Sequence, residues 1–455
     1  MGKSEFNENV IEAISIEKKI DFLERDMKDA GERLKESEEK EACVVHHNDA
    51  DGLSSAFLIQ NALQNLGFEV ESCCLERTYL RPIREICGHT KGPVIFVDLG
   101  SRAEAEMAEF GKDRLIIVLD HHGTLDISGI AEERSEEFGK NFFVLNCTRY
   151  GINGDTQASS STLAYRFCAL LDEANKKLAH IGIIGPIGDK NNLRKGAEGG
   201  RFNEDGYDIR VFREALEAVY QDNVYWIALG KEAYLVEGLA VDLTVLGSVG
   251  YKEEGPLLAL DLLRNGYSEK LYAKIRALKQ KRQEAYDKVI EKIRQKKGLK
   301  KLGDIVYFDT EAEDGVNLFA GMGTKTIGDF CNYLIDRHRK QPEEFSGIVD
   351  PPKYLMGSQR IEDITLFGQE FPIFDPEKGE WVKISIRTAH TLQDMIKKGE
   401  RPAVERLVAQ VNPNYSDGCH DERGATVVPK KRVDDYLEFS QRKIHNPNDE
   451  SQLRI

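Results

Sequence analysis

Residues 42–52 read Ala-Cys-Val-Val-His-His-Asn-Asp-Ala-Asp-Gly, a short apolar run that ends in imidazole, amide and carboxylate groups. A run of this length, followed by a helical pattern over residues 52–66, is typical of a buried strand that leads into a helix. The arrangement is repeated along the chain. We predict further strands at residues 68–72, 93–98, 115–120 and 142–145, and further helices at 103–110 and 160–173. Alternating strands and helices predict a mostly parallel sheet with helices on both faces.

Polar residues follow several of these strands at the point where each strand ends. Residues 47–51 follow the first strand, Asp98 ends the third, and residues 120–122 read Asp-His-His at the end of the fourth. In open parallel sheets, ligands bind outside the carboxyl ends of the strands, so we expect these groups to meet at one edge. Aspartate and histidine together are ligands for ions such as Mn, Fe, Co or Zn. Carboxylates this close repel one another unless cations lie between them, so the set predicts two divalent ions.

Two adjacent divalent ions are suited to phosphoester hydrolysis, because they activate water and stabilise charge at phosphorus. At the tip of a central strand, Asp98 is placed to bridge the two ions, with Asp49 and Asp51 reaching to opposite sides. His46 is expected to point away from His47 and to pack in the core, because successive residues of a strand face opposite ways.

The four motifs resemble, in order and spacing, those of the DHH phosphoesterase superfamily. They are residues 47–52, 97–100, 120–122 and 185–189. The resemblance implies a dinuclear centre, commonly manganese, with magnesium or cobalt as other possibilities. The ligands that it implies are His47, Asp49, Asp51, Asp98, His121 and Asp189. It further implies that His122 faces the scissile phosphate and that Asp120 orients the neighbouring histidines, so Asp98, His122 and Asp120 are the predicted catalytic residues.

Two further segments resemble substrate-binding elements of the same superfamily. Residues 153–162 are similar to its small-residue loop, which makes Ser159, Ser160 and Thr162 candidate phosphate contacts, although these hydroxyls could equally cap a helix. Residues 418–425 resemble the Gly-Gly-His signature of the DHH-associated domain, with Cys419 where the second glycine is usual. The substrate contacts implied there are Arg387, Gly418, His420 and Arg423.

The predicted fold class is α/β, with a parallel-sheet DHH domain and a smaller α/β substrate-binding domain joined by a helical, coiled-coil section. We expect an amphipathic helix within residues 1–40 and the DHH domain at 41–205. We expect a helical connector at 206–302, the DHH-associated domain at 303–440 and a polar tail at 441–455.

The connector contains a long basic helix, predicted from about residue 268 to 297. The formal net charge of the chain is -15, so nucleic acid would be repelled by most of the surface. Between Lys274 and Lys301, however, the sequence contains twelve Lys or Arg residues and only three acidic ones. The helix also carries a heptad-like stripe of Leu271, Ile275, Leu278, Ala285 and Val289. Contact with nucleic acid and self-association into a homo-oligomer both remain open, as does a merely solvated face.

Within the superfamily the domain order is similar to that of RecJ-type single-strand exonucleases, especially the archaeal RecJ-like proteins associated with GINS or with Hef. The resemblance implies Mn-dependent release of nucleotides from single-stranded DNA, or RNA, in repair or replication, with repair or replication proteins as partners. The first alternative is a phosphodiesterase of short oligonucleotides or cyclic dinucleotides. The second is an inactive replication or repair scaffold.

Composition limits the location of the protein. The longest apolar runs are about five residues, against roughly 20 for a membrane helix, so no membrane span is expected. No apolar segment follows Met1, and the eight cysteines include no Cys-x-x-Cys pair. We therefore expect a cytoplasmic protein with reduced thiols.

Overall fold

The computed structural model describes residues 14–101, 103–110, 112–123, 140–189, 206–221, 224–345, 348–349, 353–408, 422–446 and 453. The chain forms two compact units, and each is described by itself. Unit 1 comprises Met1–Gly247 with Glu254–Ile275, and unit 2 comprises Ser248–Glu253 with Arg276–Ile455.

Unit 1 is built on a five-stranded parallel sheet in the order β2-β1-β3-β4-β5. This confirms the predicted parallel sheet, and every predicted strand lies within two residues of an observed one. The strands are β1 (Glu41–His46), β2 (Glu69–Cys74), β3 (Val94–Val97), β4 (Ile116–Asp120) and β5 (Phe142–Asn146). Strands β3 and β4 are buried along their whole length, which is why they lack an alternating pattern.

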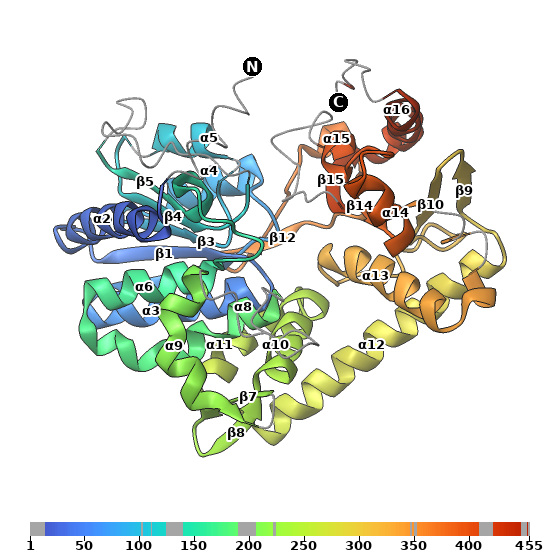
Figure 1. Ribbon diagram of the computed structural model, residues 1–455. Helices are drawn as coiled ribbons and strands as arrows, with labels where there is room; N and C mark the ends of the chain where they lie inside the picture. The colour runs from blue at the N-terminus through green and yellow to red at the C-terminus, as the bar shows by residue number, and fades with distance from the viewer. Residues whose placement is uncertain are drawn as a thin grey trace. The chain divides into compact units, whose positions relative to one another are not determined.

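Helices cover both faces of this sheet (Figure 1). Helices α3 (Ala50–Asn65) and α6 (Ser160–Leu171) lie on one face, and α4 (Leu80–His89) and α5 (Glu104–Phe110) on the other. Helix α4 was not predicted from the sequence. The short helices α7 (Ala179–Gly182) and α8 (Ile184–Gly188) follow α6. Helix α2 (Ile16–Lys35) packs against α6 and β5 and buries Leu23, Met27 and Leu34, so its apolar stripe serves packing.

The rest of unit 1 contains a small sheet that the sequence analysis missed. Strands β6 (Tyr220–Gln221), β7 (Val224–Leu229) and β8 (Glu232–Leu235) form an antiparallel sheet where an all-helical connector was expected. Strand β7 buries Tyr225, Ile227 and Leu229 on alternate positions, as a half-covered strand does. The flanking helices are α9 (Tyr207–Val219), α10 (Val236–Thr244) and α11 (Gly255–Asn265).

The predicted basic helix is observed as α12 (Glu269–Arg294), and the chain passes from unit 1 to unit 2 within it. Its heptad-like stripe is buried by the protein itself, with exposed fractions of 5% or less at all five positions. The stripe is therefore not free to pair with a helix of a second copy. Self-association through this stripe is therefore not supported by the burial of these residues, and it stays a prediction.

Unit 2 contains a mixed sheet in the order β15-β14-β11-β10-β9, in which only β10 and β11 run parallel. Its strands are β9 (Leu299–Leu302), β10 (Ile305–Asp309), β11 (Tyr354–Arg360), β14 (Trp381–Thr388) and β15 (Arg423–Pro429). A short hairpin is formed by β12 (Ile364–Leu366) and β13 (Gln369–Phe371). The α/β fold class with a second, smaller domain is thus confirmed.

Helix α13 (Lys325–Lys340) packs on one face of this sheet, where its Gly328 lies against Ser385 and Arg387. On the opposite face, α14 (His390–Lys397), α15 (Val404–Val408) and α16 (Val433–His445) close a core that includes Tyr307 and Val382. Residues Gln441–His445, predicted as the start of a polar tail, belong to α16.

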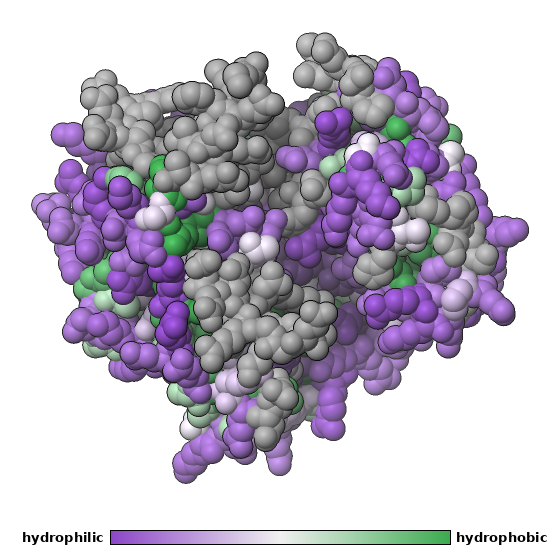
Figure 2. Space-filling model, in the orientation of Figure 1, coloured by the Kyte–Doolittle hydropathy of each residue, from purple (hydrophilic) through white to green (hydrophobic). Residues whose placement is uncertain are grey.

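Short helical turns complete the described chain. They are the 3-10 helices η3 (Cys147–Tyr150), η4 (Glu173–Leu178), η6 (Pro342–Phe345), η7 (Pro376–Lys378) and η9 (Lys430–Arg432), and the π-helix η5 (Val245–Val249). On the face drawn in Figure 2, hydrophilic side chains predominate among the coloured residues, and hydrophobic ones form small separate groups. Among the residues that the structure describes, no helix combines the length and the hydrophobicity that crossing a membrane requires.

Candidate metal centre

The carboxyl ends of β1, β3 and β4 bring the predicted ligands to one edge of the parallel sheet. In the sheet register, His46 lies beside Val97, and Val97 lies beside Leu119. His47, Asp98 and Asp120 are the next residues of the three strands, so they emerge side by side. Asp49 then caps the N-terminus of α3, where its Oδ1 accepts from the amide of Gly52 at 3.0 Å.

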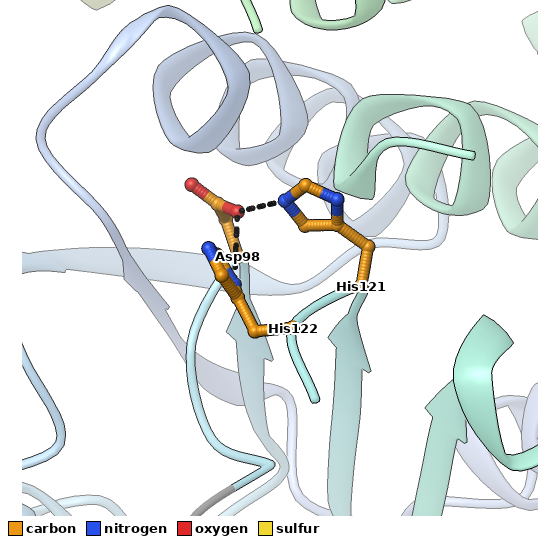
Figure 3. Close-up of side chains that lie close together, drawn as sticks. All are labelled: Asp98, His121 and His122. Carbon is orange, nitrogen blue, oxygen red and sulfur yellow. Dashed lines mark ion pairs between the residues drawn. The ribbon is translucent and has the colours of Figure 1, made fainter. Parts of the chain in front are cut away.

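Three groups of these side chains are close enough to hold a metal ion. The groups are Asp98 with His121 and His122, His47 with Asp49 and Asp98, and Asp51 with His121 and Asp189, each with its ligand atoms within 4.8 Å of one another. Asp98 and His121 each belong to two groups, so the centre is continuous. In Figure 3 the carboxylate of Asp98 faces both His121 and His122.

His121 shows most directly that the site suits a cation. Its Nδ1 lies 2.8 Å from the carbonyl oxygen of Gly154, and a carbonyl only accepts, so Nδ1 carries the proton. The buried Nε2 makes no hydrogen bond and faces carboxylate oxygens of Asp51, Asp98 and Asp189 at 3.8, 3.4 and 3.5 Å. Three carboxylates around one imidazole nitrogen repel one another unless a positive charge, a proton on Nε2 or a metal ion, lies between them. The donor set therefore fits a divalent metal.

The pKa values of His121 and Asp51 agree with the interpretation that this cluster binds a cation. Burial lowers the pKa of His121, but the carboxylates of Asp98, Asp189 and Asp51 outweigh burial and raise it well above its usual range. Burial, reinforced by the charges of Asp98 and Asp189, raises the pKa of Asp51 well above its usual range. Both shifts mean that the cluster lacks positive charge, which a bound cation would supply.

The N-terminus of α6 holds Asp51 in place. The amides of Ser160 and Ser161 donate to Oδ2 and Oδ1 of Asp51, each at 2.8 Å. A carboxylate at a helix N-terminus meets unpaired backbone N–H groups and the positive end of the helix dipole. The helix end that was predicted to bind a phosphate thus binds one of the predicted metal ligands.

The side-chain hydroxyls at the N-terminus of α6 also bond to groups of the protein itself. Ser160 Oγ donates to Asp98 Oδ1 at 3.1 Å, Ser159 Oγ accepts from the amide of Thr162 as an N-cap, and Thr162 Oγ1 donates to Asp208. Ser159, Ser160 and Thr162 are all 0% exposed. Their burial gives no support to the predicted role as substrate-phosphate contacts, which stays a prediction. The alternative of helix capping is confirmed for Ser159.

Asp120 orients the two histidines that follow it. Its Oδ1 accepts from His122 Nδ1 at 2.8 Å and from the amides of His121 and His122 at 2.8 and 3.2 Å. Burial opposes ionisation, but His122, His121 and the amide of Ser101 together hold the pKa of Asp120 well below its usual range. His122 is more open than His121, since 31% of its side chain is exposed against 8% for His121.

His47 completes the other end of the centre. Its Nδ1 lies 3.0 Å from Asp49 Oδ2 and 3.2 Å from Asp98 Oδ2. Asp98 has a φ of 60°, in the left-handed region that costs energy for any residue with a side chain. His46 is 1% exposed, as predicted for a core residue, and burial lowers its pKa to about 4.

Sequence reasoning missed the steric role of two glycines. A Cβ at Gly185 would lie 1.9 Å from Asp51 Oδ1 and 2.0 Å from Ser161 Oγ, and one at Gly154 would lie 1.9 Å from the carbonyl oxygen of His121. Gly185 is the first residue of the fourth predicted motif, so its position in the sequence already indicated that it belongs to the site. Gly154 lies in the predicted small-residue loop, but its contact with His121 could not be predicted, because the two residues are 33 positions apart in the sequence.

In unit 2, only part of the predicted substrate set can be placed. Arg387 and Arg423 are paired across β14 and β15. Arg387 Nη1 donates to the carbonyl oxygens of Ile386 and Gly424 at 2.9 and 3.2 Å. Gly418 and His420 lie outside the described residues.

Comparisons with known proteins find a matching family model and similar folds. Residues 41–185 match the DHH family, N-terminal domain. RecJ from Thermus thermophilus, in complex with Mn2+, is similar with a TM-score of 0.52 and 14% identity over 94% of this chain and 56% of that chain. An exonuclease RecJ bound to manganese has a TM-score of 0.50 and 14% identity over 92% of this chain and 94% of that chain.

A third similar structure is the DHH domain of a protein assigned to a family of ribosomal proteins. Its TM-score is 0.54, at 14% identity over 93% of this chain and 91% of that chain. The chain spans 56% of the length of the Thermus RecJ chain. Among curated proteins, the comparison found no match. At these identities the likeness concerns the fold alone. The chain therefore carries a DHH family domain at residues 41–185, within a fold that is similar to that of RecJ.

Proposed function

We propose that the protein is a metal-dependent phosphodiesterase that releases nucleotides from an end of single-stranded DNA or RNA. The observation that carries this proposal is the buried Nε2 of His121, which faces three carboxylates at the sheet edge where Asp98 joins two of the three donor groups. Such a set at the carboxyl end of a parallel sheet is suited to divalent metals.

The residues divide between two cation positions that share Asp98. His47 and Asp49 would hold one ion, and Asp51, His121 and Asp189 the other. Two divalent cations there would neutralise the phosphate, lower the pKa of water and stabilise the charge that develops at phosphorus. We propose manganese, because a RecJ of similar fold was determined with Mn2+. Magnesium and cobalt remain other candidates.

Beside the cations, His122 is the group placed to meet the substrate. Its Nδ1–H donates to Asp120, which fixes the orientation of the ring and leaves the other nitrogen to face a phosphate oxygen. A nitrogen held in this orientation beside the scissile phosphate could interact with the negative charge that develops there.

The nucleic-acid substrate is supported by the similarity to RecJ exonucleases and by the basic surface of α12. Arg387 and Arg423 of the second domain, together with Gly418 and His420, are proposed to contact the strand. A role in repair or replication, with partners of the kind bound by GINS- or Hef-associated RecJ-like proteins, is part of the same proposal.

The test is cleavage of single strands labelled at each end in turn, in the presence of Mn2+. Asp98→Ala should lower the rate at least about a thousandfold, because it removes the carboxylate shared by both cation positions, while the circular dichroism spectrum is unchanged. Asp113→Ala, at an exposed aspartate of the same unit, is the matched control. Full-rate cleavage by Asp98→Ala would rule out the assigned centre.

The alternative substrate class differs in its dependence on length. If the protein acts on short oligonucleotides or cyclic dinucleotides, strands of two to five nucleotides should be cleaved faster than long ones. If the protein is an inactive scaffold, no substrate is cleaved and no Mn2+ is retained on metal analysis. Faster cleavage of long strands supports the exonuclease proposal.

A further inference from the structure

A pocket of about 670 Å³ lies in unit 2, apart from the metal centre of unit 1. The sheet supplies its floor through Tyr307 of β10, Ser358 of β11 and Val382 of β14. Lys292 at the end of α12 and Lys300 of β9 form one wall. The start of α16 forms another. The volume falls within the range of about 300–1,000 Å³ that is typical of small-molecule sites.

This pocket is distinct from the substrate contacts that the DHH-associated signature implies. Arg387 lies five residues beyond Val382 on the same strand, which is roughly 16 Å at about 3.3 Å per residue. The two side chains also use opposite faces of the sheet. Val382 belongs to the core closed by α14, α15 and α16, whereas Arg387 lies against Gly328 of α13. A single ligand therefore cannot contact both Val382 and Arg387, because the sheet lies between their side chains.

The charged groups of the lining favour an anion. The cations are Lys292, Lys297, Lys300, Arg360, Lys430 and Lys431. Four carboxylates accompany them, and each is paired with one of the lysines: Asp309 with Lys292, Glu311 with Lys430, Glu313 with Lys297 and Asp434 with Lys300. The described lining thus has two more basic than acidic groups, in a chain whose net charge is -15. Of these two, Arg360 is paired with Glu380 outside the lining, so Lys431 is the cation of the described lining that is most open to an added anion.

Two further features indicate which anion. Helix α16 has 13 residues and begins at Val433 in the pocket wall, which places the positive end of its dipole in that wall, although the amide of Val433 itself donates to the carbonyl oxygen of Lys430. The floor offers hydroxyls rather than charges, because Tyr307 and Ser358 are hydrogen-bonded to each other at 2.6 Å beside the apolar Val382. A phosphate on a small organic body matches a basic wall above a partly apolar floor.

We propose that this pocket is a second ligand site, which binds a small phosphate-bearing molecule. Nucleoside monophosphate and free inorganic phosphate share the required chemistry. The proposal concerns binding alone, so it does not depend on the proposed exonuclease activity.

The experiment is isothermal titration calorimetry of the full chain after treatment with EDTA. The ligands are adenosine 5′-monophosphate, inorganic phosphate and adenosine. We expect a phosphate-bearing ligand to bind and adenosine to give no heat. Tighter binding of the monophosphate than of phosphate identifies a nucleotide as the ligand, and equal binding identifies the phosphate group alone.

Amino-acid substitutions test whether the ligand binds in this pocket. Lys431→Glu should weaken it at least about tenfold, since it reverses an exposed charge of the wall without disturbing the core. Lys398→Glu, at an exposed lysine of unit 2 outside the lining, is the matched control and should change the affinity less than about twofold. Asp98→Ala, in the metal centre, should leave binding unchanged.

Two results would overturn the proposal. The first is the absence of heat with both the monophosphate and phosphate up to about 10 mM. The second is binding that survives Lys431→Glu and is lost in Asp98→Ala, which would place the ligand at the metal centre. Loss of binding in Lys431→Glu counts only if thermal unfolding of that variant matches the unsubstituted protein. If the variant is unfolded, Lys431→Ala takes its place.

Discussion

At the scale of single residues, Asp98 concentrates the constraints of the site. Asp98 directly follows the fully buried strand β3 and adopts a left-handed backbone conformation. Its two carboxylate oxygens contact different partners. Oδ1 accepts from Ser160 and faces His121, and Oδ2 faces His47. A residue held in a strained conformation by so many neighbours is typical of a functional position, where the surrounding structure offsets the cost.

Asp120→Asn tests whether Asp120 orients residues rather than holding metal. The amide retains an oxygen for the backbone amides of His121 and His122, but it replaces the charged acceptor of His122 Nδ1–H with a neutral one and so holds the ring less firmly. We expect the rate of hydrolysis to fall about 10- to 100-fold with bound metal unchanged. Steady-state kinetics and metal analysis by mass spectrometry measure the two effects. Loss of metal along with activity would instead make Asp120 a ligand.

At the scale of elements, the end of one helix and the glycine of another determine the position of Asp51. The N-terminus of α6 donates two amides to its carboxylate, and Gly185 of α8 leaves the space that the carboxylate occupies. The short helix α8 therefore affects the metal centre because Gly185, which has no side chain, leaves room for the carboxylate of Asp51.

Gly185→Ala should therefore displace Asp51 and weaken metal binding. The added Cβ would lie 1.9 Å from Asp51 Oδ1, closer than any real contact, so the carboxylate or the helix must shift. We expect at least about a tenfold loss of Mn2+ affinity by calorimetry. The control is Gly88→Ala, where the added Cβ meets nothing within 4 Å. There, Ala should favour the helix by about 0.5–1 kcal/mol. Unchanged Mn2+ affinity in Gly185→Ala would contradict this account.

Helix α12 combines a buried stripe with basic residues. Leu278 is 1% exposed, so Leu278→Ala should lower the free energy of unfolding by about 2–5 kcal/mol. Arg276→Ala, on the exposed side of the same helix, should change it by less than about 0.5 kcal/mol. Urea unfolding at two protein concentrations measures both values. An effect of Leu278→Ala that depends on protein concentration would favour the self-association that we predicted from the stripe.

At the scale of the whole molecule, the two units should respond differently to metal. All six predicted ligands lie in unit 1, and the residues predicted to bind the substrate through the DHH-associated signature belong to unit 2. A ligand that binds only the folded form of one unit stabilises that unit, by about 2.7 kcal/mol at a free concentration about 100 times its Kd.

Differential scanning calorimetry with Mn2+ and with EDTA tests this expectation. We expect Mn2+ to raise the midpoint of one unfolding transition and to leave a second one in place. Asp98→Ala should abolish the shift. An equal shift of all transitions, or a shift that persists in Asp98→Ala, would show that Mn2+ acts elsewhere in the chain.

Much of unit 1 could be predicted because its signals are local. Buried strands of four to six residues appear as apolar runs, and the residues after them mark where each strand ends. The β6-β7-β8 sheet and helix α4 were missed. The strands of that sheet are short or only half-buried, so their apolar patterns are weak. The stripe of α12 was seen, but its partner could not be, since a stripe does not identify the surface that covers it.

The sequence by itself determined the parallel α/β domain and the identity of the groups at its edge, because strand ends and motif spacing are encoded by neighbouring residues. Only the tertiary structure decided what those groups do. The hydroxyls of Ser159 and Ser160, predicted to reach a phosphate, are buried, with Ser160 bonded to Asp98 and Ser159 bonded within the first turn of α6. The proton on Nδ1 of His121 is assigned by a carbonyl far along the chain. Such roles depend on contacts between distant segments, which exist only after the chain has folded.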